Sequence, residues 1–84
     1  MKQLYTFSAN WCQGCQAFKP VLEAAQKQKM PIKTINIDYE GDVVEKYKVY
    51  TIPTTILVED EKEVRRFTGY KNLNQLINFY NGDN

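Results

Sequence analysis

The sequence predicts an α/β fold in which three helices cover a four-stranded mixed sheet, in the order β-α-β-α-β-β-α. Apolar residues recur at the helical spacing of three and four over 18–25 and 73–80. Short runs rich in β-branched and aromatic residues, at 2–7 and 32–38, are typical of strands instead. Elements that alternate in this way place helices on both faces of a sheet. Because the chain has 84 residues and no repeat or linker, we expect a single domain over residues 1–84.

The first strand and the first helix are separated by a polar break. The strand is expected at 2–7 and the break at Ser8 to Asn10. From Cys15 to about Met30 the apolar residues fall on one helical face, namely Phe18, Val21, Leu22 and Ala25. Pro20 lies inside this helix and lacks the N–H that would bond to Gln16, so we predict a kink there without a break.

The second strand and the second helix follow directly. Residues 32–38 carry three isoleucines, and the helical crossover before them predicts that this strand runs parallel to the first. The second helix is expected over 42–50. Asp42, with Glu45 three residues later, resembles a capping box at its start.

The last part of the chain reads as a hairpin followed by a helix. Strands at 54–60 and 63–69 are joined by a tight turn around Asp60 and Glu61, and a helix begins after Asn72 and stops at Gly82. We expect the core to draw on residues from all of these elements: Leu4, Tyr5, Phe7, Phe18, Val21, Leu22, Ile35, Ile37, Ile56, Val58, Phe67, Leu73 and Ile77.

Charge and hydropathy exclude several classes of partner. Eleven basic and ten acidic side chains give a net charge of +1, which offers no attraction for nucleic acid or an acidic membrane surface. The chain contains no apolar run of signal-peptide or bilayer-spanning length. We therefore expect a cytoplasmic monomer that binds neither nucleic acid nor membrane.

The two cysteines, Cys12 and Cys15, are separated by two residues and admit three interpretations. A structural disulfide is one, although the loop is too short to restrict the unfolded chain much and such bonds are rare in the cytosol. A zinc site is another, but it needs four ligands, and with two Cys and no His the chain would have to share metal in a dimer. The third is redox chemistry, which a Cys-X-X-Cys pair near a βαβ pattern favours.

The position of the pair at a helix start suits dithiol exchange. Unpaired N–H groups and the helix dipole favour a thiolate there, so Cys12 is the candidate nucleophile. Cys15, about one turn later, is expected to point inward while Cys12 stays exposed on the rim. Attack by Cys12 on a substrate disulfide gives a mixed disulfide, which Cys15 then resolves. No metal or cofactor is needed.

Several motifs together resemble the thioredoxin family over nearly the whole chain. They are "WCQGC" at 11–15, Pro20 five residues after the second cysteine, "IPT" at 52–54 and "FTG" at 67–69. The resemblance implies a thioredoxin-like fold, a cis peptide bond between Ile52 and Pro53, and reduction of protein disulfides with thioredoxin reductase as electron source. It also implies a substrate surface around the cysteines, formed by Trp11, Gln13, Gly14, Thr51, Ile52 and Pro53.

The chain departs from the family pattern at several positions. It lacks the family's first strand and first helix, and Gln13-Gly14 replaces the usual Gly-Pro between the cysteines. Thr6 and Thr34 stand where relatives keep a buried acid and a lysine that assist proton transfer at the second cysteine. The sequence therefore assigns no base to Cys15, and a water or the leaving thiolate is our hypothesis for that role.

Other functions stay open. Small redoxins of glutaredoxin size and thioredoxin behaviour, which supply electrons to ribonucleotide reductase, are similar to this mixture of features, so that enzyme is a candidate substrate. A glutathione-linked glutaredoxin is an alternative, although "GYK" at 69–71 replaces the Gly-Gly-Asp-like turn that binds glutathione. A binding module that does not use its cysteines is the other alternative.

Overall fold

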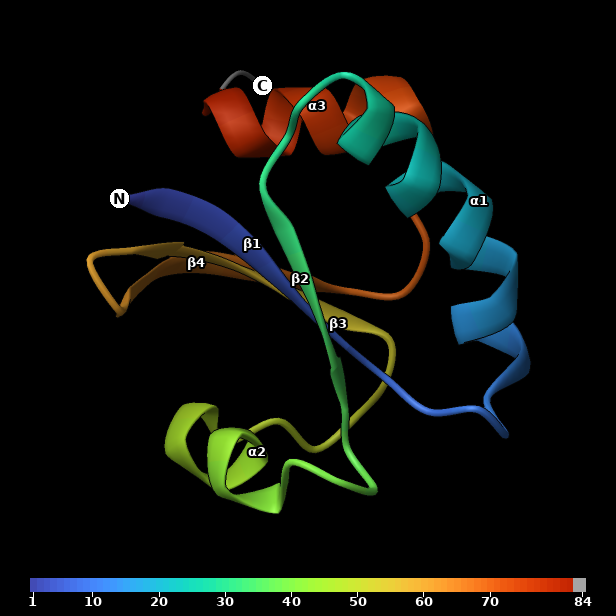
Figure 1. Ribbon diagram of the computed structural model, residues 1–84, viewed down its shortest axis with the longest axis vertical. Coiled ribbons are helices and arrows are strands. Elements are labelled where there is room, and N and C mark those ends of the chain that lie inside the picture. Colours follow the sequence, from blue (N-terminus) through green and yellow to red (C-terminus); the bar gives the residue numbers. More distant parts are fainter. Residues whose placement is uncertain (83–84) are drawn as a thin grey trace.

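The computed structural model describes residues 1–82 and has the predicted order of elements (Figure 1). The strands and helices are β1 (Lys2–Ser8), α1 (Gln13–Lys27), β2 (Ile32–Asn36), α2 (Gly41–Tyr47), β3 (Thr54–Glu59), β4 (Lys62–Thr68) and α3 (Leu73–Asn81). None of these helices is both long and apolar enough to cross a membrane.

The four strands form one mixed sheet in the order β2-β1-β3-β4. β1 and β2 are parallel, with Leu4 opposite Ile32 and Thr6 opposite Thr34, as the crossover predicted. β3 runs antiparallel to both β1 and β4, which confirms the hairpin. Because the neighbouring strands β1 and β3 are antiparallel, the loop that follows β1 and the loop that precedes β3 emerge at the same end of the sheet.

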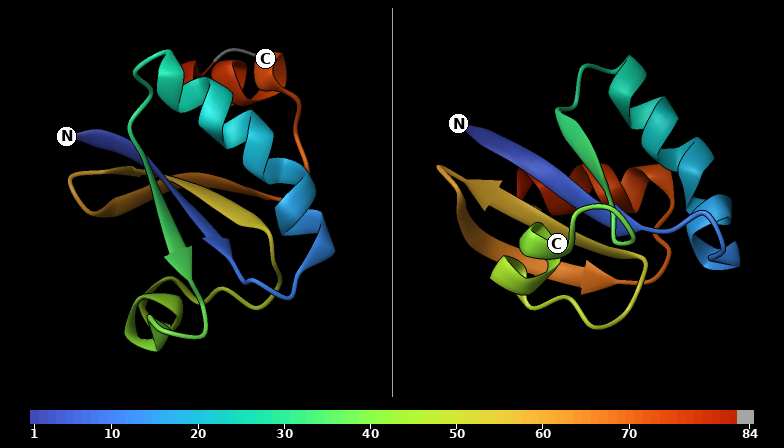
Figure 2. Two further views of the ribbon diagram at one scale, coloured as in Figure 1. Left: turned by 45° about the vertical axis from the view of Figure 1, so that its right-hand side comes forward. Right: turned by 60° about the horizontal axis from the view of Figure 1, so that its bottom comes forward.

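Helices cover both faces of the sheet. α1 and α3 lie on one face and α2 lies on the other, in all three views (Figures 1 and 2). Each face has its own apolar cluster. The cluster beneath α1 and α3 contains Leu4, Phe18, Leu22, Ala25, Leu57 and Leu76, and the cluster beneath α2 contains Phe7, Ile35, Tyr47, Val49, Ile56 and Val58.

The predicted core is confirmed at its centre and differs at its margins. Seven predicted residues are buried: Leu4, Phe7, Phe18, Leu22, Ile35, Ile56 and Val58. The others are half-buried: Tyr5, Val21, Ile37, Phe67, Leu73 and Ile77. Leu57 and Leu76 are buried but were not predicted. Leu57 belongs to a central strand that is covered on both faces, so its side chains are buried without alternation.

The local signals differ in how well they located helix ends. α1 runs through Pro20 without a break, as predicted, and ends at Lys27. The capping box predicted at Asp42 is wrong: Glu40 is the N-cap residue of α2, without a side-chain cap, and Asp42 lies in the first turn. The carbonyl of Asn36 accepts hydrogen bonds from the N–H groups of Tyr39 and Glu40. Because of this turn after β2, the helix begins at Gly41, one residue before Asp42.

The signals at the hairpin and the last helix are confirmed. Asp60 and Glu61 form the tight turn, both in the left-handed region at φ of 53° and 68°, although neither is glycine. Asn72 caps α3 in a reciprocal capping box with Gln75. Gly82 ends the helix at φ 82°, a conformation that glycine adopts without steric cost.

Candidate active site

Cys12 is the N-cap residue of α1, in the loop that follows β1. Its Sγ accepts a hydrogen bond from the backbone N–H of Cys15 at 3.2 Å, and its carbonyl accepts one from the N–H of Gln16 at 3.1 Å. The sulfur therefore takes the place of the oxygen that a serine or aspartate cap would supply. Both cysteines are free thiols, so this is the dithiol form of the protein. The predicted placement of the pair at the helix start is confirmed.

The expected contrast in exposure between the two cysteines is wrong. Cys12 is 9% exposed and Cys15 is 6% exposed, so neither side chain lies open on the rim. Because the Cys12 sulfur folds back to cap the helix, it packs with Ala9 and Cys15 against the partly buried Ile37 and Ile52. The difference between the two thiols must therefore come from their surroundings.

Cys15 has the chemistry of a thiol that keeps its proton. Burial, followed by the hydrogen bond with the Cys12 thiol, raises the pKa of Cys15 from 9.0 to about 11. Both effects disfavour its thiolate while Cys12 is free. Cys15 is thus unsuited to attack first on an external disulfide at neutral pH.

The loop before β3 lies beside the cysteine loop at the same end of the sheet. The Ile52–Pro53 peptide bond is cis, as the family resemblance implied. Pro53 is buried, and its carbonyl accepts a hydrogen bond from the Gly69 N–H at 2.8 Å. A Cβ added to Gly14 would lie 3.6 Å from Pro53 Cδ, in ordinary contact, so the two loops lie against each other. The fold therefore brings Gly14 and Pro53 together beside Cys12 and Cys15.

Trp11 projects from the other side of the cysteine loop. It is 67% exposed, and its Nε1–H donates a hydrogen bond to Asp38 Oδ2 at 3.0 Å. Asp38 was not among the predicted site residues, although an acid directly after a strand was a signal that could have drawn attention to it. Gln13 and Thr51 are exposed, and Ile52 is half-buried.

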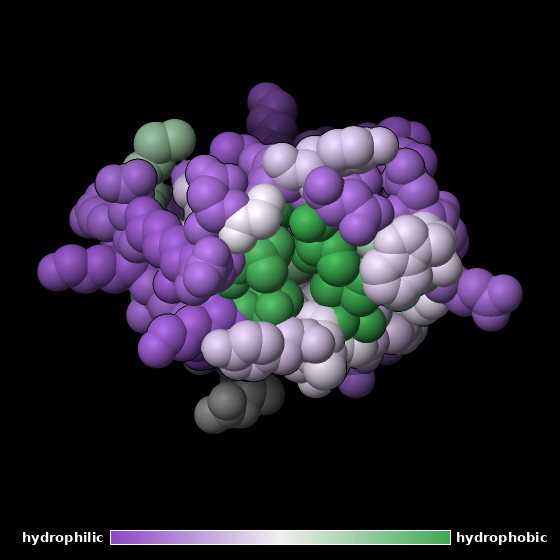
Figure 3. All heavy atoms as spheres, turned by 90° about the horizontal axis from the view of Figure 1, so that it is seen from below, coloured by the Kyte–Doolittle hydropathy of each residue, from purple (hydrophilic) through white to green (hydrophobic). Residues whose placement is uncertain are grey.

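Figure 3 views the molecule from the side of α2 and shows a hydrophobic patch framed by hydrophilic side chains.

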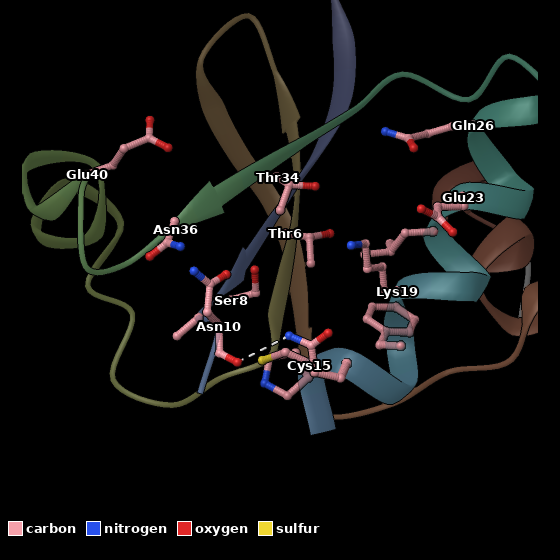
Figure 4. A pocket seen from close by; sticks show the side chains of 15 residues that line it. Thr6, Ser8, Asn10, Cys15, Lys19, Glu23, Gln26, Thr34, Asn36 and Glu40 are labelled. Carbon is pink, nitrogen blue, oxygen red and sulfur yellow. Dashed lines mark hydrogen bonds between the residues drawn. The ribbon is translucent and has the colours of Figure 1, made fainter. Parts of the chain in front are cut away.

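A polar cavity of about 280 Å³ lies behind Cys15, between α1 and the strands β1 and β2 (Figure 4). Thr6 and Thr34, which the resemblance places at the family's acid and lysine positions, both line it. Thr6 is buried, and its Oγ1 lies 3.3 Å from Thr55 Oγ1. Further lining residues are Ser8, Asn36, Lys19, Glu23 and Glu40. No local sequence pattern points to Lys19 or Glu23, because only tertiary packing places this face of α1 over the strands.

Metal ligands do not gather in the described part of the chain. Within residues 1–82, no three His, Cys, Asp or Glu side chains lie close enough together to hold a metal ion.

Comparisons with known proteins agree with this geometry. The family model described as Thioredoxin matches residues 1–82. A thioredoxin of Chlamydia pneumoniae is 41% identical over 80 residues, which are 93% of this chain and 78% of that protein. A thioredoxin of Chlamydia trachomatis is 42% identical over 76 residues, which are 88% of this chain and 74% of that protein.

Solved structures give the same result for the fold. A mutant thioredoxin from Halobacterium salinarum superposes with a TM-score of 0.89 at 27% identity, covering 96% of this chain and 73% of the other. The thioredoxin of Fasciola hepatica superposes with a TM-score of 0.87 at 28% identity, covering 99% of this chain and 81% of the other. The predicted fold class is confirmed.

Proposed function

This chain belongs to the thioredoxin family and is a thiol-disulfide oxidoreductase, and from that premise we propose that Cys12 is its nucleophile and Cys15 its resolving thiol. The observation that carries this assignment is the unequal environment of the two sulfurs. The Cys12 Sγ lies at the N-terminus of α1 and accepts a hydrogen bond from the backbone N–H of Cys15. The Cys15 pKa is raised to about 11, so Cys15 holds its proton until Cys12 has reacted.

The reaction proceeds in two exchanges. The Cys12 thiolate attacks one sulfur of the substrate disulfide, forms a mixed disulfide and releases the other substrate sulfur as a thiolate. Cys15 loses its proton and attacks Cys12 Sγ, so that the bond between Cys12 and the substrate breaks and the bond between Cys12 and Cys15 forms. The substrate leaves with both sulfurs reduced, and the protein carries the disulfide. The second exchange is fast because the two thiols are held within one helical turn.

A substrate segment is proposed to lie across the two loops that meet at the cysteines. The surface consists of Trp11, Gln13, Gly14, Thr51, Ile52 and Pro53. Its support is the exposure of Trp11, Gln13 and Thr51 and the contact of Gly14 with Pro53. An exposed tryptophan beside a reactive thiol offers a large apolar contact for a partner at little cost in conformational entropy.

The partners follow from the same assignment. Members of the family act on disulfide-containing substrates, and we propose thioredoxin reductase as the electron source and ribonucleotide reductase as a candidate substrate. The chain is proposed to work as a cytoplasmic monomer. The similarity to the chlamydial thioredoxins, and the mixture of features noted in the sequence, support this assignment.

A redox titration with thiol trapping tests the assignment. The protein is equilibrated in dithiothreitol buffers of graded potential, and free thiols are alkylated and counted by mass. We expect Cys12 and Cys15 to gain or lose label together, as one two-electron couple. Independent titration of the two cysteines would refute the mechanism.

The electron source is tested by an insulin or ribonucleotide reductase assay run with two reducing systems. NADPH with thioredoxin reductase is expected to support turnover, and glutathione with glutathione reductase is not. The reverse result would indicate a glutaredoxin. If the Cys12→Ser variant kept full biological activity, the chain would be a binding module instead.

A further inference from the structure

One face of α1 carries both the resolving cysteine and a pair of opposite charges. Cys15, Lys19 and Glu23 are four residues apart, so they follow one another along the same face of the helix. All three line the polar cavity behind the active site. In Figure 4 the Lys19 side chain reaches from α1 toward Thr6 on β1, across the space that Cys15 borders.

The strands that face Lys19 contribute no charged side chain to the cavity. β1 and β2 contribute uncharged groups, chiefly Thr6, Ser8, Thr34 and Asn36. The charged groups around the cavity are Lys19 and Glu23 of α1 and Glu40, which precedes α2. Of the cavity-lining residues in the described range, 1–82, Lys19 is therefore the one cation.

We propose that Lys19 is an electrostatic positioning residue that stabilises the Cys15 thiolate in the resolving step, and that the helix thereby supplies an ionisable group that the strands lack. This proposal rests on the proposed roles of Cys12 and Cys15. Thr6 and Thr34 can donate or accept hydrogen bonds, but they carry no charge. Lys19 lies one turn from Cys15; it is exposed like Lys27, but unlike Lys27 it lines the cavity that Cys15 borders, and its side chain points toward Thr6 (Figure 4).

The mixed-disulfide intermediate is the state in which this charge matters. In the free dithiol, the hydrogen bond between the two thiols contributes to the retention of the Cys15 proton. Once Cys12 is bonded to substrate, its sulfur is neutral and that thiol–thiol hydrogen bond is lost. What then opposes ionisation of Cys15 is mainly its burial, and what favours ionisation is the charge and water of the cavity.

The step balances without a further reactant. The Cys15 proton passes to cavity water, the Cys15 thiolate displaces the substrate sulfur from Cys12, and the departing substrate thiolate takes up a proton from solvent. Lys19 neither gains nor loses a proton. It lowers the free energy of the negative sulfur while that sulfur exists.

Rapid mixing with excess 5,5′-dithiobis(2-nitrobenzoate) separates the two exchanges. The first thionitrobenzoate is released when Cys12 attacks, at a rate proportional to reagent concentration. The second is released when Cys15 resolves the mixed disulfide, at a rate independent of reagent. The variants are Lys19→Gln, Lys19→Glu and Lys19→Arg. The matched control is Lys27→Gln, because Lys27 is an exposed lysine of the same helix that does not line the cavity.

We expect Lys19→Gln to slow the second release at pH 7 by about threefold to tenfold, the effect of half to one unit in the pKa of Cys15. Lys19→Glu should slow it further, and Lys19→Arg should keep the wild-type rate. The pH profile of the second release should move to higher pH in Lys19→Gln, while the first release stays unchanged in all variants. High salt should slow the wild type and leave Lys19→Gln unaffected.

Two results would overturn the proposal. One is a second release in Lys19→Gln that matches Lys27→Gln between pH 6 and pH 9. The other is a slowing of equal size at every pH, which would indicate a structural role for Lys19. Loss of the second release in the wild type itself would instead refute the proposed roles of Cys12 and Cys15, so the two failures are distinguishable.

Discussion

Cys12 and Cys15 lie one helical turn apart, yet they face different regions of the molecule. Cys12 packs beside Ile37 and Ile52 at the loop surface, next to the exposed Trp11. Cys15 borders a polar cavity between α1 and the strands. Because the exposed fractions of the two side chains are almost equal, exposure alone does not distinguish the attacking thiol from the resolving thiol. We call the part around Cys12 and Trp11 the surface side and the part around Cys15 and the polar cavity the cavity side. We infer from the difference that the surface side captures a substrate and that the cavity side manages a proton.

Exchange of each cysteine for serine separates the two sides most strongly. We expect Cys12→Ser to lower disulfide reductase activity by on the order of 10³-fold or more, because no thiolate remains at the helix start. Cys15→Ser should still capture substrate and should accumulate a mixed disulfide, visible by mass spectrometry and reversed by dithiothreitol. Accumulation of that adduct in Cys12→Ser instead would exchange the proposed roles.

The buried proton of Cys15 should appear as a loss of stability at alkaline pH. Its pKa is 9.0 in its ordinary state and about 11 in the folded dithiol. Between these values the unfolded chain has lost the proton and the folded chain still holds it, so stability falls as pH rises. We expect a decrease of about 2 to 3 kcal/mol in the free energy of unfolding across this window. Urea unfolding of the reduced protein measures it.

The Cys15→Ser variant is the control for this measurement, since lysines and tyrosines titrate in the same range in both proteins. The predicted decrease is the difference between the two pH curves. Parallel curves from pH 8 to pH 11 would show that Cys15 ionises equally in the folded and unfolded states.

Placing a carboxyl group in the cavity should change the proton transfer alone. Thr6→Asp introduces an acceptor on the cavity wall, and we expect it to speed the resolving step by about tenfold at pH 7 and to alter its pH profile. The Asn side chain of Thr6→Asn has nearly the same shape as Asp but cannot act as a base, so this variant should leave the pH profile of the resolving step unchanged. Substrate capture by Cys12 should be equal in all three proteins. Identical profiles for the two variants would mean that the Cys15 proton does not leave through this cavity.

The surface side was far easier to predict from the sequence than the cavity side. Cys12, Cys15, Trp11 and Pro53 belong to short contiguous motifs, and the strand and helix patterns that place them act over a few residues. The cavity arises where α1 lies over β1 and β2, so Lys19 and Glu23 line the same cavity as Thr6 only through tertiary packing. No local pattern of charges on a helix indicates what that helix will cover.

The errors have the same origin. Asp42 followed by Glu45 satisfies the local rule for a helix cap, but the turn held by the Asn36 carbonyl starts α2 earlier. Leu57 is absent from the predicted core, yet it is buried because its strand is central and covered on both faces. In both cases a contact with a neighbouring element, and not the local sequence, determines where the helix starts or whether the residue is buried.

The smallest effect that we predict concerns the hydrogen bond between Trp11 and Asp38 on the surface side. The bond holds the exposed indole ring at a fixed place beside Cys12. Asp38→Ala frees the ring, which adds the entropic cost of ordering one side chain to substrate capture. We expect a decrease of about twofold to threefold in kcat/KM for insulin, with no change in the resolving step. Asp38→Asn keeps an oxygen acceptor and should stay close to wild type.

A double-mutant cycle decides whether Asp38 acts through the tryptophan. In a Trp11→Phe background the ring has no N–H to donate, so Asp38→Ala should have no further effect on kcat/KM. An equal decrease in both backgrounds would mean that Asp38 contacts the substrate itself, and the capture surface would then extend beyond the two loops to the residues that follow β2. Because both thiol environments keep their own hydrogen bonds in these variants, the resolving step serves as the internal reference. The surface side can thus be weakened in small steps while the cavity side is left intact.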